Sequence, residues 1–346
     1  MKLQIGFIGA GAMGLSHVNS IQKLCGDRAE VAAVCDTSEA NLQKAVAAAP
    51  GARVFKKPSE LIESPVDAIF VSTPNFTHTG LALEILRADK HLFLEKPCGI
   101  TKQECRQILE ASEKSDRVLM IGHEMRYSPF FQKIKQLVDA GEIGTPRMVW
   151  TREFRGPFQK KVGNWIVDDR CSGGCLVDKN CHHFDAMNWW VGARPKRVAA
   201  FGGCAVNRVI EGPHQVHDHA SVSFEYENGV RGTLHLCMFA LDFPNEDLEM
   251  GIIGDAGTLQ TRISKIEILQ YKSGSNQKEP LVHKVKAKFG EGWGNHLGFD
   301  EIHEAFIQAV LENKRPLTTV RDCVDGTLLA IAAEESTKRG SVVEID

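Results

Sequence analysis

The sequence predicts an α/β protein with two domains. Residues 1–125 are expected to form a doubly wound parallel sheet, and residues 126–346 an α+β domain with a large, mostly antiparallel open sheet. Short apolar runs alternate with helical patterns in the first part, which is typical of parallel crossovers. In the second part, Glu227-Asn228-Gly229 joins two strand-like runs and contains the Asn-Gly pair that favours a hairpin. The length of 346 residues agrees with two domains of roughly 150 residues each.

The strands of the first part are almost entirely apolar, as expected when helices cover both faces of a parallel sheet. The predicted strands are Leu3–Ile8, Val31–Val34, Ala68–Val71, His91–Leu94 and Val118–Ile121, and the predicted helices are Gly11–Leu24, Glu39–Ala49, Thr77–Ala88 and Lys102–Ser115.

The pattern changes after Pro129, where strands dominate. The predicted helices are Pro129–Ala140, Phe299–Leu311 and Cys323–Lys338, and the predicted strands are Arg147–Arg152, Arg197–Gly202, Ala220–Tyr226, Gly232–Cys237, Met250–Gly254 and Ile263–Tyr271.

Composition excludes several classes of protein. The formal net charge of −3 gives no general attraction to nucleic acid or to an anionic membrane. The uncharged stretch Leu3–Gln22 is too rich in glycine and polar residues for a signal peptide or a membrane helix. Ten cysteines in a chain of this length, with no export signal, favour reduced thiols over a disulfide framework. We therefore expect a cytoplasmic protein.

The first chemical motif follows the first predicted strand and opens a helix. It reads Gly9-Ala10-Gly11-Ala12-Met13-Gly14, a Gly-x-Gly-x-x-Gly pattern in the context that a Rossmann dinucleotide site requires. The phosphates of a bound dinucleotide would meet N–H groups at the helix N-terminus. Asp36, 22 residues after Gly14, ends the second strand, where an acid binds the ribose 2′-hydroxyl and repels a 2′-phosphate. This favours NAD over NADP.

Two further loops begin where strands end, at the edge where ligands bind in open α/β sheets. The loop after Ala68–Val71 is expected to border the cofactor. The alternative interpretation is that Thr77 in this loop serves only as the N-cap of the next helix. The loop contains Ser72, Thr73, Pro74, Asn75 and His78. Glu95-Lys96-Pro97 follows the next strand. Proline restricts the preceding residue and permits a cis bond, so Lys96 is expected to point in one fixed direction.

A polar segment of the second part combines carboxylates with histidines. Asp178 and His182 are four residues apart, so on an α-helix they share a face, and Asp185 is on the same side. A carboxylate beside an imidazole orients it and raises its basicity, which suits a general base. The alternative is a set of polar residues on a helix surface.

These motifs, in this order and spacing, resemble the Gfo/Idh/MocA family of oxidoreductases over nearly the whole chain. The resemblance implies a Rossmann domain, a C-terminal α/β domain with an open sheet that pairs subunits, and hydride transfer between NAD(P) and a hydroxyl-bearing carbon of a sugar, inositol or related polyol. It therefore implies a homodimer or homotetramer. It also extends to Arg126 and Trp165, which are expected at the cofactor with Glu95 and Lys96.

The resemblance also assigns catalytic roles. Lys96 would hold and polarise the reacting oxygen, His182 would take the hydroxyl proton, and Asp178 would hold the substrate or orient His182. The chain departs from the family where Asn180 replaces a residue that is commonly glycine. Asn180 and His183 are therefore expected to shape the substrate pocket, and His296 is a further candidate for contact with the substrate.

Three alternatives remain open. Cysteines and histidines between Cys171 and His183, and the group His214, His217 and His219, suggest a metal site, but they lack the paired spacing of zinc sites. A second alternative is a lyase or glycosidase that oxidises its substrate transiently with tightly held NAD. A third is a dinucleotide-binding regulator without catalysis, against which the retention of Lys96, Asp178 and His182 argues.

Overall fold

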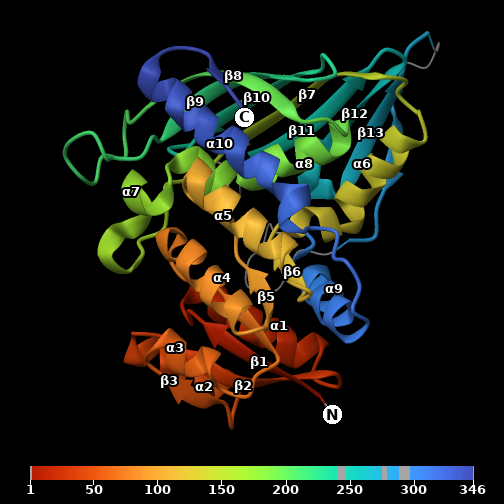
Figure 1. Cartoon of the computed structure of the whole chain (residues 1–346). Coiled ribbons are helices and arrows are strands. Elements are labelled where there is room, and N and C mark those ends of the chain that lie inside the picture. The colour runs from red at the N-terminus through yellow and green to blue at the C-terminus, as the bar shows by residue number, and fades with distance from the viewer. Residues whose placement is uncertain (1, 241–246, 275–278, 288–296, 346) are drawn as a thin grey trace. The chain divides into compact units, whose positions relative to one another are not determined.

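The computed structural model describes residues 2–240, 247–274, 279–287 and 297–345 (Figure 1). Among these residues the chain forms two compact units. The first unit comprises residues 2–127 and 299–324, and the second comprises the others. The first break, after Tyr127, lies close to the expected boundary. The expected division was contiguous, whereas in the structure residues 299–324 return to the first unit.

The first unit is built on a sheet of six parallel strands in the order β3-β2-β1-β4-β5-β6. This confirms the predicted doubly wound sheet. Its strands are β1 (Leu3–Ile8), β2 (Ala29–Cys35), β3 (Arg53–Phe55), β4 (Ala68–Val71), β5 (His91–Leu94) and β6 (Leu119–Ile121). Its helices are α1 (Ala12–Leu24), α2 (Glu39–Ala48), α3 (Pro58–Ile62), α4 (His78–Arg87), α5 (Lys102–Glu113) and α9 (Phe299–Leu311), with short 3₁₀ turns η1 (Asn75–Thr77) and η2 (Glu124–Tyr127).

Aromatic rings fill the core of the first unit. Phe70 of β4 stacks on Phe93 of β5, with ring centroids 4.5 Å apart, and on Phe7 of β1 at 4.8 Å. Phe306 of α9 meets the rings of Phe70 and Phe93 edge-on. Offset and edge-on contacts of this kind add to the stabilisation that burial provides. Helix α9 is therefore part of this core, although it follows the core strands by about 200 residues, a span longer than a typical whole domain.

The second unit contains a nine-stranded sheet in the order β14-β13-β12-β11-β7-β10-β9-β8-β15. Neighbouring strands are antiparallel except β7 and β10, so the expected mostly antiparallel sheet is confirmed. Its strands are β7 (Pro146–Phe154), β8 (Pro195–Gly203), β9 (His219–Tyr226), β10 (Arg231–Cys237), β11 (Asp247–Gly254), β12 (Gly257–Arg262), β13 (Glu267–Lys272), β14 (Leu281–Lys284) and β15 (Val343–Glu344). Its helical elements are α6 (Pro129–Asp139), α7 (Asp169–Ser172), α8 (Cys181–Val191) and most of α10 (Val320–Arg339), with the turns η3 (Val162–Val167), η4 (Leu176–Asn180) and η5 (Ile263–Lys265).

The predicted hairpin between β9 and β10 is present. The N–H of Gly229 donates to the carbonyl of Tyr226 at 3.0 Å, and Gly229 has a φ of +85°. Glycine adopts this conformation without the steric cost that a side chain would add. Along β9 every second residue is buried, as expected for a strand with one covered face.

The predicted strand Ile263–Tyr271 is confirmed only from Glu267 onward, where β13 lies, and is wrong for its first residues. The chain reverses through η5, and Arg262 of β12 pairs with Glu267 of the antiparallel strand β13. Ile266 completes the reversal with a φ of +52°, which is rare for a β-branched residue. The apolar, β-branched composition of this segment concealed the turn. Among the described residues, no helix combines the length and the apolar character needed to cross a membrane.

Candidate functional site

The three glycines of the first turn have three different environments. A Cβ on Gly14 would lie 1.9 Å from the carbonyl oxygen of Gly9, and a Cβ on Gly9 would lie 2.7 Å from the backbone of Ser72. A Cβ on Gly11 would meet nothing within 4 Å. Gly9 and Gly14 therefore allow the turn, α1 and β4 to pack closely, whereas Gly11 leaves open space at the start of α1. This is the division of roles that a pyrophosphate site requires.

The start of α1 is suited to an anion. Its N-cap residue is Gly11, no side chain caps it, and the first turn contains no acidic residue. The first N–H groups of a helix have no helical acceptor and carry the positive end of its dipole. Ala12 and Met13 occupy these first positions. The residues present thus fit the phosphates of a dinucleotide.

Asp36 holds the glycine turn against the end of β2. Its carboxylate accepts the N–H of Ala10 at 2.7 Å and the N–H of Ser38 at 2.8 Å. It also accepts the side-chain amide of Asn41 at 3.3 Å. The structure therefore shows a conformational role for Asp36, and its contact with a ribose remains a prediction.

The loop after β4 is tied to its neighbours by side chains. The hydroxyl of Ser72 donates to the carbonyl of Gly9 at 2.8 Å. The ring nitrogens of His78 contact the carbonyls of Thr73 at 3.0 Å and Pro97 at 2.8 Å, so His78 joins this loop to the turn after β5. The hydroxyl of Thr77 donates to the carbonyl of Pro74 at 2.7 Å. Thr77 is thus the N-cap residue of α4 by position, as the alternative interpretation expected, but its side chain accepts no N–H of the helix. Asn75, in η1, is buried.

The turn after β5 places Lys96 between two fixed residues. The bond between Lys96 and Pro97 is cis, and the N–H of Lys96 donates to Oε2 of Glu95 at 3.1 Å. Glu95 is buried, and its Oε1 lies 2.9 Å from Nε2 of His17 in α1. The side chain of Lys96 is half-buried. In η2, Arg126 is buried and donates to the carbonyl of Asp322 at 2.7 Å.

In the second unit, Asp178 and His182 do not belong to one regular α-helix. Leu176–Asn180 form a π turn, and α8 begins at Cys181. The segment is therefore helical but departs from regular α-helical geometry, since a π turn contains one more residue than an α turn, and the shared face of Asp178 and His182 stays a prediction. Such turns occur often at functional sites. Both Asp178 and His182 are buried, with 5% and 8% of their surface exposed.

Glu334 of α10 holds the start of this segment. Its Oε1 accepts the N–H of Leu176 at 2.7 Å, and its side chain occupies the space beside Gly174, which has a φ of +107°. A Cβ on Gly174 would lie 2.4 Å from the carboxyl carbon of Glu334. A glycine is therefore required for the carboxyl group to reach the backbone that leads into Asp178.

A second buried carboxylate, Glu153 of β7, contacts the polar face of this segment. The amide nitrogen of Asn180 donates to Oε2 of Glu153 at 2.8 Å and lies 3.1 Å from Nδ1 of His183. Burial alone would raise the pKa of Glu153, but the charges of His183 and Arg155 outweigh it and hold the pKa below its ordinary value. The amide oxygen of Asn180 is buried and has no hydrogen-bond partner among the described residues. Asn180 thus holds a buried acceptor, unsatisfied within the described part of the chain, beside an ionised carboxylate.

The remaining predicted residues are one tryptophan and four histidines of the C-terminal part of the chain. Trp165 is half-buried in η3, and His296 lies outside the described residues. The three histidines before β9 each lie close to a carboxylate. His214 lies 2.9 Å from Asp169, His219 lies 2.9 Å from Asp218, and His217 lies 3.5 Å from Glu334.

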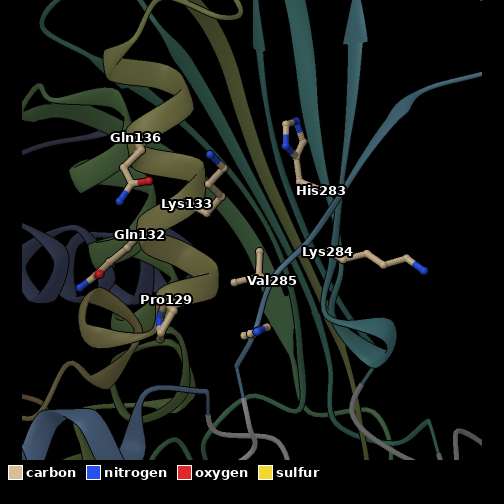
Figure 2. A pocket seen from close by; sticks show the side chains of 8 residues that line it. Pro129, Gln132, Lys133, Gln136, His283, Lys284 and Val285 are labelled. Atoms are coloured by element: carbon tan, nitrogen blue, oxygen red, sulfur yellow. The ribbon is translucent and has the colours of Figure 1, made fainter.

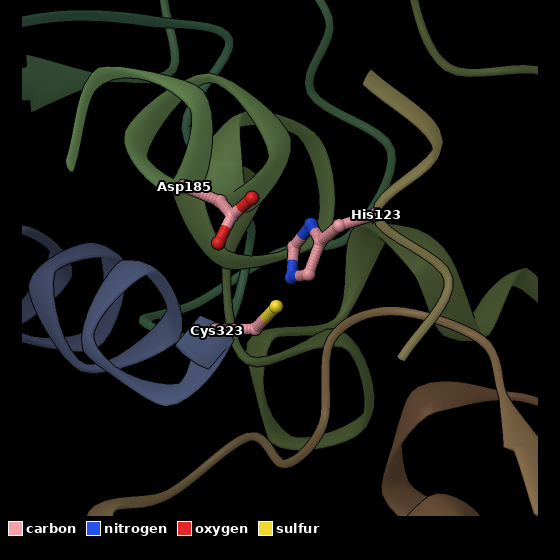
Figure 3. A group of neighbouring side chains, drawn as sticks. All are labelled: His123, Asp185 and Cys323. Atoms are coloured by element: carbon pink, nitrogen blue, oxygen red, sulfur yellow. The ribbon is translucent and has the colours of Figure 1, made fainter. Parts of the chain in front are cut away.

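Two groups of side chains in the described residues have the composition of metal ligands. His123 and Cys323, both of the first unit, have ligand atoms within 4.8 Å of each other, and Figure 3 also labels Asp185 of the second unit. Asp168, Asp169 and His214 form the other group. Their carboxylates already pair with cations, because Asp168 binds Arg170 and Asp169 binds Lys338. Neither group includes Asp178 or His182.

Each unit also has an open surface groove. In the second unit, a groove of about 370 Å³ lies between α6 and β14, lined by Lys133 and His283 (Figure 2). Burial, together with the charge of Lys133, lowers the pKa of His283. In the first unit, a groove of about 500 Å³ is lined by Arg117, Arg315 and Arg321. Neither groove is lined by the predicted catalytic residues.

Comparison with known proteins identifies the family. Residues 3–123 match the model of an oxidoreductase family with an NAD-binding Rossmann fold, and residues 131–260 match the GFO/IDH/MocA C-terminal domain. The chain belongs to the GFO/IDH/MocA family. It is therefore an oxidoreductase, and its first unit is the NAD-binding Rossmann domain of that family.

Individual relatives are similar over their full length. Myo-inositol 2-dehydrogenase of Thermotoga maritima is 25% identical, covering 99% of each chain. The scyllo-inositol 2-dehydrogenase (NAD(+)) of Bacillus subtilis is 24% identical, covering all of this chain and 97% of that one. The crystal structure of an oxidoreductase domain protein from Kribbella flavida has a TM-score of 0.89 at 22% identity, with complete coverage of both chains. The last comparison shows that the two chains share the same fold.

Sequence reasoning missed four buried polar residues in the hydrogen-bond networks around the predicted site residues: His17, Glu153, His303 and Glu334. Glu153 is part of an alternating strand, where an inward acid is an exception to the apolar pattern. That exception was a usable signal. His17, His303 and Glu334 are on helices with ordinary amphipathic patterns, and their partners are distant in the sequence.

Proposed function

We propose that the protein is an NAD-dependent dehydrogenase that oxidises a secondary hydroxyl of inositol, a sugar or a related polyol. The observation that carries the proposal is the polar cluster of Glu153, Asn180 and His183 beside the π turn. The buried amide oxygen of Asn180, which has no hydrogen-bond partner in the described part of the chain, and the ionised carboxylate beside it provide acceptors for the hydroxyl groups of a polyol. The inositol dehydrogenases among the relatives support the same class of substrate.

In this proposal the chain's residues divide the work of alcohol oxidation. Lys96 holds and polarises the reacting oxygen, and His182 accepts the hydroxyl proton as general base. Asp178 holds the substrate or orients His182. Asn180 and His183 bind other hydroxyls of the substrate. When bound, NAD supplies the hydride acceptor.

The remaining predicted residues bind the cofactor in this proposal. Gly9, Gly11 and Gly14 form the phosphate turn, and Asp36 selects NAD by its negative charge. The loop that contains Ser72, Thr73, Pro74 and Asn75 borders the cofactor, as do Arg126 and Trp165. His78 positions this loop through its two contacts with backbone carbonyls.

The test is a screen of inositols and sugars with NAD, and separately with NADP, followed by absorbance at 340 nm. We expect NADH formation with one polyol, and His182→Ala is expected to lower kcat by roughly 10²-fold or more, as for loss of a general base. The matched control is His235→Ala, which removes an exposed histidine of β10 in the same unit. Equal kcat values for the two variants would contradict the role of His182.

One observation favours a second candidate, transient oxidation with elimination and re-reduction. Glu153 and His183 provide an additional carboxylate and imidazole beside Asn180, which suits a second proton transfer. This candidate predicts turnover of a glycoside without net NADH by protein that retains NAD after purification. Net NADH formation from a simple polyol contradicts it.

We further propose that the sheet of the second unit pairs subunits into a homodimer or homotetramer. Its strands expose large apolar side chains on the face opposite to the buried one. Phe201 of β8 is 78% exposed and Met148 of β7 is 47% exposed. Light scattering tests this proposal, and a monomer would contradict it.

A further inference from the structure

A chain of three buried polar side chains runs from the Lys96 turn to helix α9, entirely within the first unit. Oε1 of Glu95 lies 2.9 Å from Nε2 of His17, and Nδ1 of His17 lies 2.7 Å from Nε2 of His303. Nδ1 of His303 lies 2.6 Å from the carbonyl oxygen of Phe299. His17 is 1% exposed, His303 is fully buried and Glu95 is 8% exposed. The chain joins α1, the turn after β5 and α9.

The number of protons in this chain follows from its hydrogen bonds. Both ends are acceptors, a carboxylate oxygen of Glu95 and the carbonyl oxygen of Phe299. With Glu95 ionised, as the lowered pKa of its carboxyl group indicates, a proton is required on each ring nitrogen that faces an end, and a third proton is required between the two rings. Two neutral imidazoles carry only two protons. The pair His17–His303 must therefore hold one additional proton, whose charge balances the carboxylate.

The pKa values of both groups that flank His17, the carboxyl of Glu95 and the ring of His303, lie below their ordinary values. Burial and repulsion from His17 hold the pKa of His303 well below its ordinary value, so His303 is the neutral ring. Burial alone would raise the pKa of Glu95, but the hydrogen bond and charge of His17 outweigh it and keep the pKa below its ordinary value. A buried charge is retained only where it is paired, and this pair is enclosed by the rings of Phe70, Phe93 and Phe299.

Other titratable groups also act on Glu95. Lys96 and Glu124 carry opposite charges, and their effects on the pKa of Glu95 oppose each other. Burial lowers the pKa of His78, the neighbouring histidine.

We propose that Glu95, His17 and His303 form a hydrogen-bonded chain that positions Lys96. The two rings of this chain share one proton more than two neutral imidazoles carry. The proposal rests on the proposed function, in which Lys96 holds the reacting oxygen. Oε2 of Glu95 accepts the N–H of Lys96, while His17 fixes Oε1, so the carboxylate cannot turn without losing one of these bonds. His303 in turn fixes the ring of His17. The three are positioning residues, because they act on the substrate through Lys96.

The first test counts protons with ¹⁵N NMR of histidine-labelled protein, since ¹⁵N shifts distinguish protonated from unprotonated ring nitrogens. We expect three of the four ring nitrogens of His17 and His303 to carry protons. In Glu95→Gln the amide N–H donates to His17 and the amide oxygen accepts the N–H of Lys96. All contacts then persist with only two protons on the four ring nitrogens of His17 and His303. The variant is therefore expected to show two protonated ring nitrogens. A count of two in the wild-type protein would overturn the proposal.

The second test breaks the far end of the chain. His303→Phe keeps a ring beside Phe299 but removes both hydrogen bonds. The matched control is Phe306→Leu, which alters the same helix and the same aromatic core without touching the chain. We expect His303→Phe to increase hydrogen exchange at the Lys96 amide and to lower kcat/KM for the polyol by roughly 10- to 100-fold, as for a small misplacement of a reacting group. Affinity for NADH should change less than kcat/KM.

The outcomes separate this proposal from the proposed function. Equal exchange at Lys96 in His303→Phe and Phe306→Leu would overturn the positioning role. If the wild-type protein oxidises no polyol, the proposed function fails, but the proton count and the exchange at Lys96 still decide whether the chain exists and holds Lys96. The proton count uses the wild-type protein, so it remains decisive if His303→Phe does not fold.

Discussion

The buried carboxyl group of Glu334 leads to a quantitative prediction about the second unit. Glu334 is 5% exposed and accepts the N–H of Leu176 at the start of the π turn. Burial raises its pKa to about 7, although the backbone N–H groups and Lys338 act in the opposite direction. Between pH 4.5 and about 7 the folded protein therefore holds a proton that the unfolded chain has released.

The sign and size of the effect follow from this difference. Below pH 4.5, the pKa of Glu334 in the unfolded chain, Glu334 is protonated in both states, and its full contribution to the free energy of unfolding is present. As the pH rises from 4.5 to about 7, only the unfolded state releases the proton, so the free energy of unfolding falls. Each pH unit costs about 1.4 kcal/mol. The total loss is about 3 kcal/mol and is complete above the folded pKa.

Glu334→Gln removes this titration while keeping an oxygen that accepts the N–H of Leu176. We expect the free energy of unfolding of the variant, minus that of the wild type, to increase by about 2.5 kcal/mol between about pH 5 and pH 8. Urea unfolding followed by tryptophan fluorescence measures it. Trp150, Trp165, Trp189 and Trp190 all belong to the second unit, so the signal reports on that unit.

The control is Glu335→Gln, which removes a carboxylate from the neighbouring position of α10. Glu335 pairs with Arg339 near the surface, where an ion pair contributes at most about 1 kcal/mol. A difference between Glu334→Gln and wild type that stays constant with pH would refute the reasoning, because it would show that Glu334 has the same pKa in both states.

The remaining predictions concern cofactor binding. Gly14→Ala is expected to destabilise the first unit by at least about 2 kcal/mol, because its methyl group would collide with the carbonyl of Gly9, and urea unfolding checks it. Gly11→Ala meets open space, so it is expected to leave stability within about 1 kcal/mol but to weaken NADH binding in a fluorescence titration; unchanged binding would contradict the phosphate role of this turn. Asp36→Ala, combined with an arginine nearby, is expected to reduce the preference for NAD over NADP, measured as the ratio of the two kcat/KM values. Unchanged discrimination would exclude Asp36 as the selecting residue.

Local patterns in the sequence were sufficient for much of the first unit. Strand β1, the glycine turn and α1 follow one another within a short stretch, and Asp36 ends the next strand, so spacing alone specifies their relation. The turn after β5 could also be located, because Pro97 restricts Lys96. These features depend on neighbouring residues, which is why the sequence reveals them.

Features that depend on distant residues were not predictable. His303 follows His17 by 286 positions, and no local pattern connects them. The π turn before α8 was missed because spacing does not reveal an additional residue within a turn. The reversal at Ile266 was missed because a β-branched residue in a left-handed conformation contradicts its local preference.

The return of α9 to the first unit has a consequence for biosynthesis. Phe306 and Ile302 belong to the hydrophobic core that also contains Phe7 and Phe70. A ribosome that has completed residue 127 must still make residues 128–324 before this core is whole. At typical rates of synthesis this takes roughly 10–40 s, during which the apolar surface that α9 later covers stays exposed to chaperones. A truncated protein that ends at residue 127 would keep that surface permanently, so a stable isolated nucleotide-binding domain must include residues 299–324 as well.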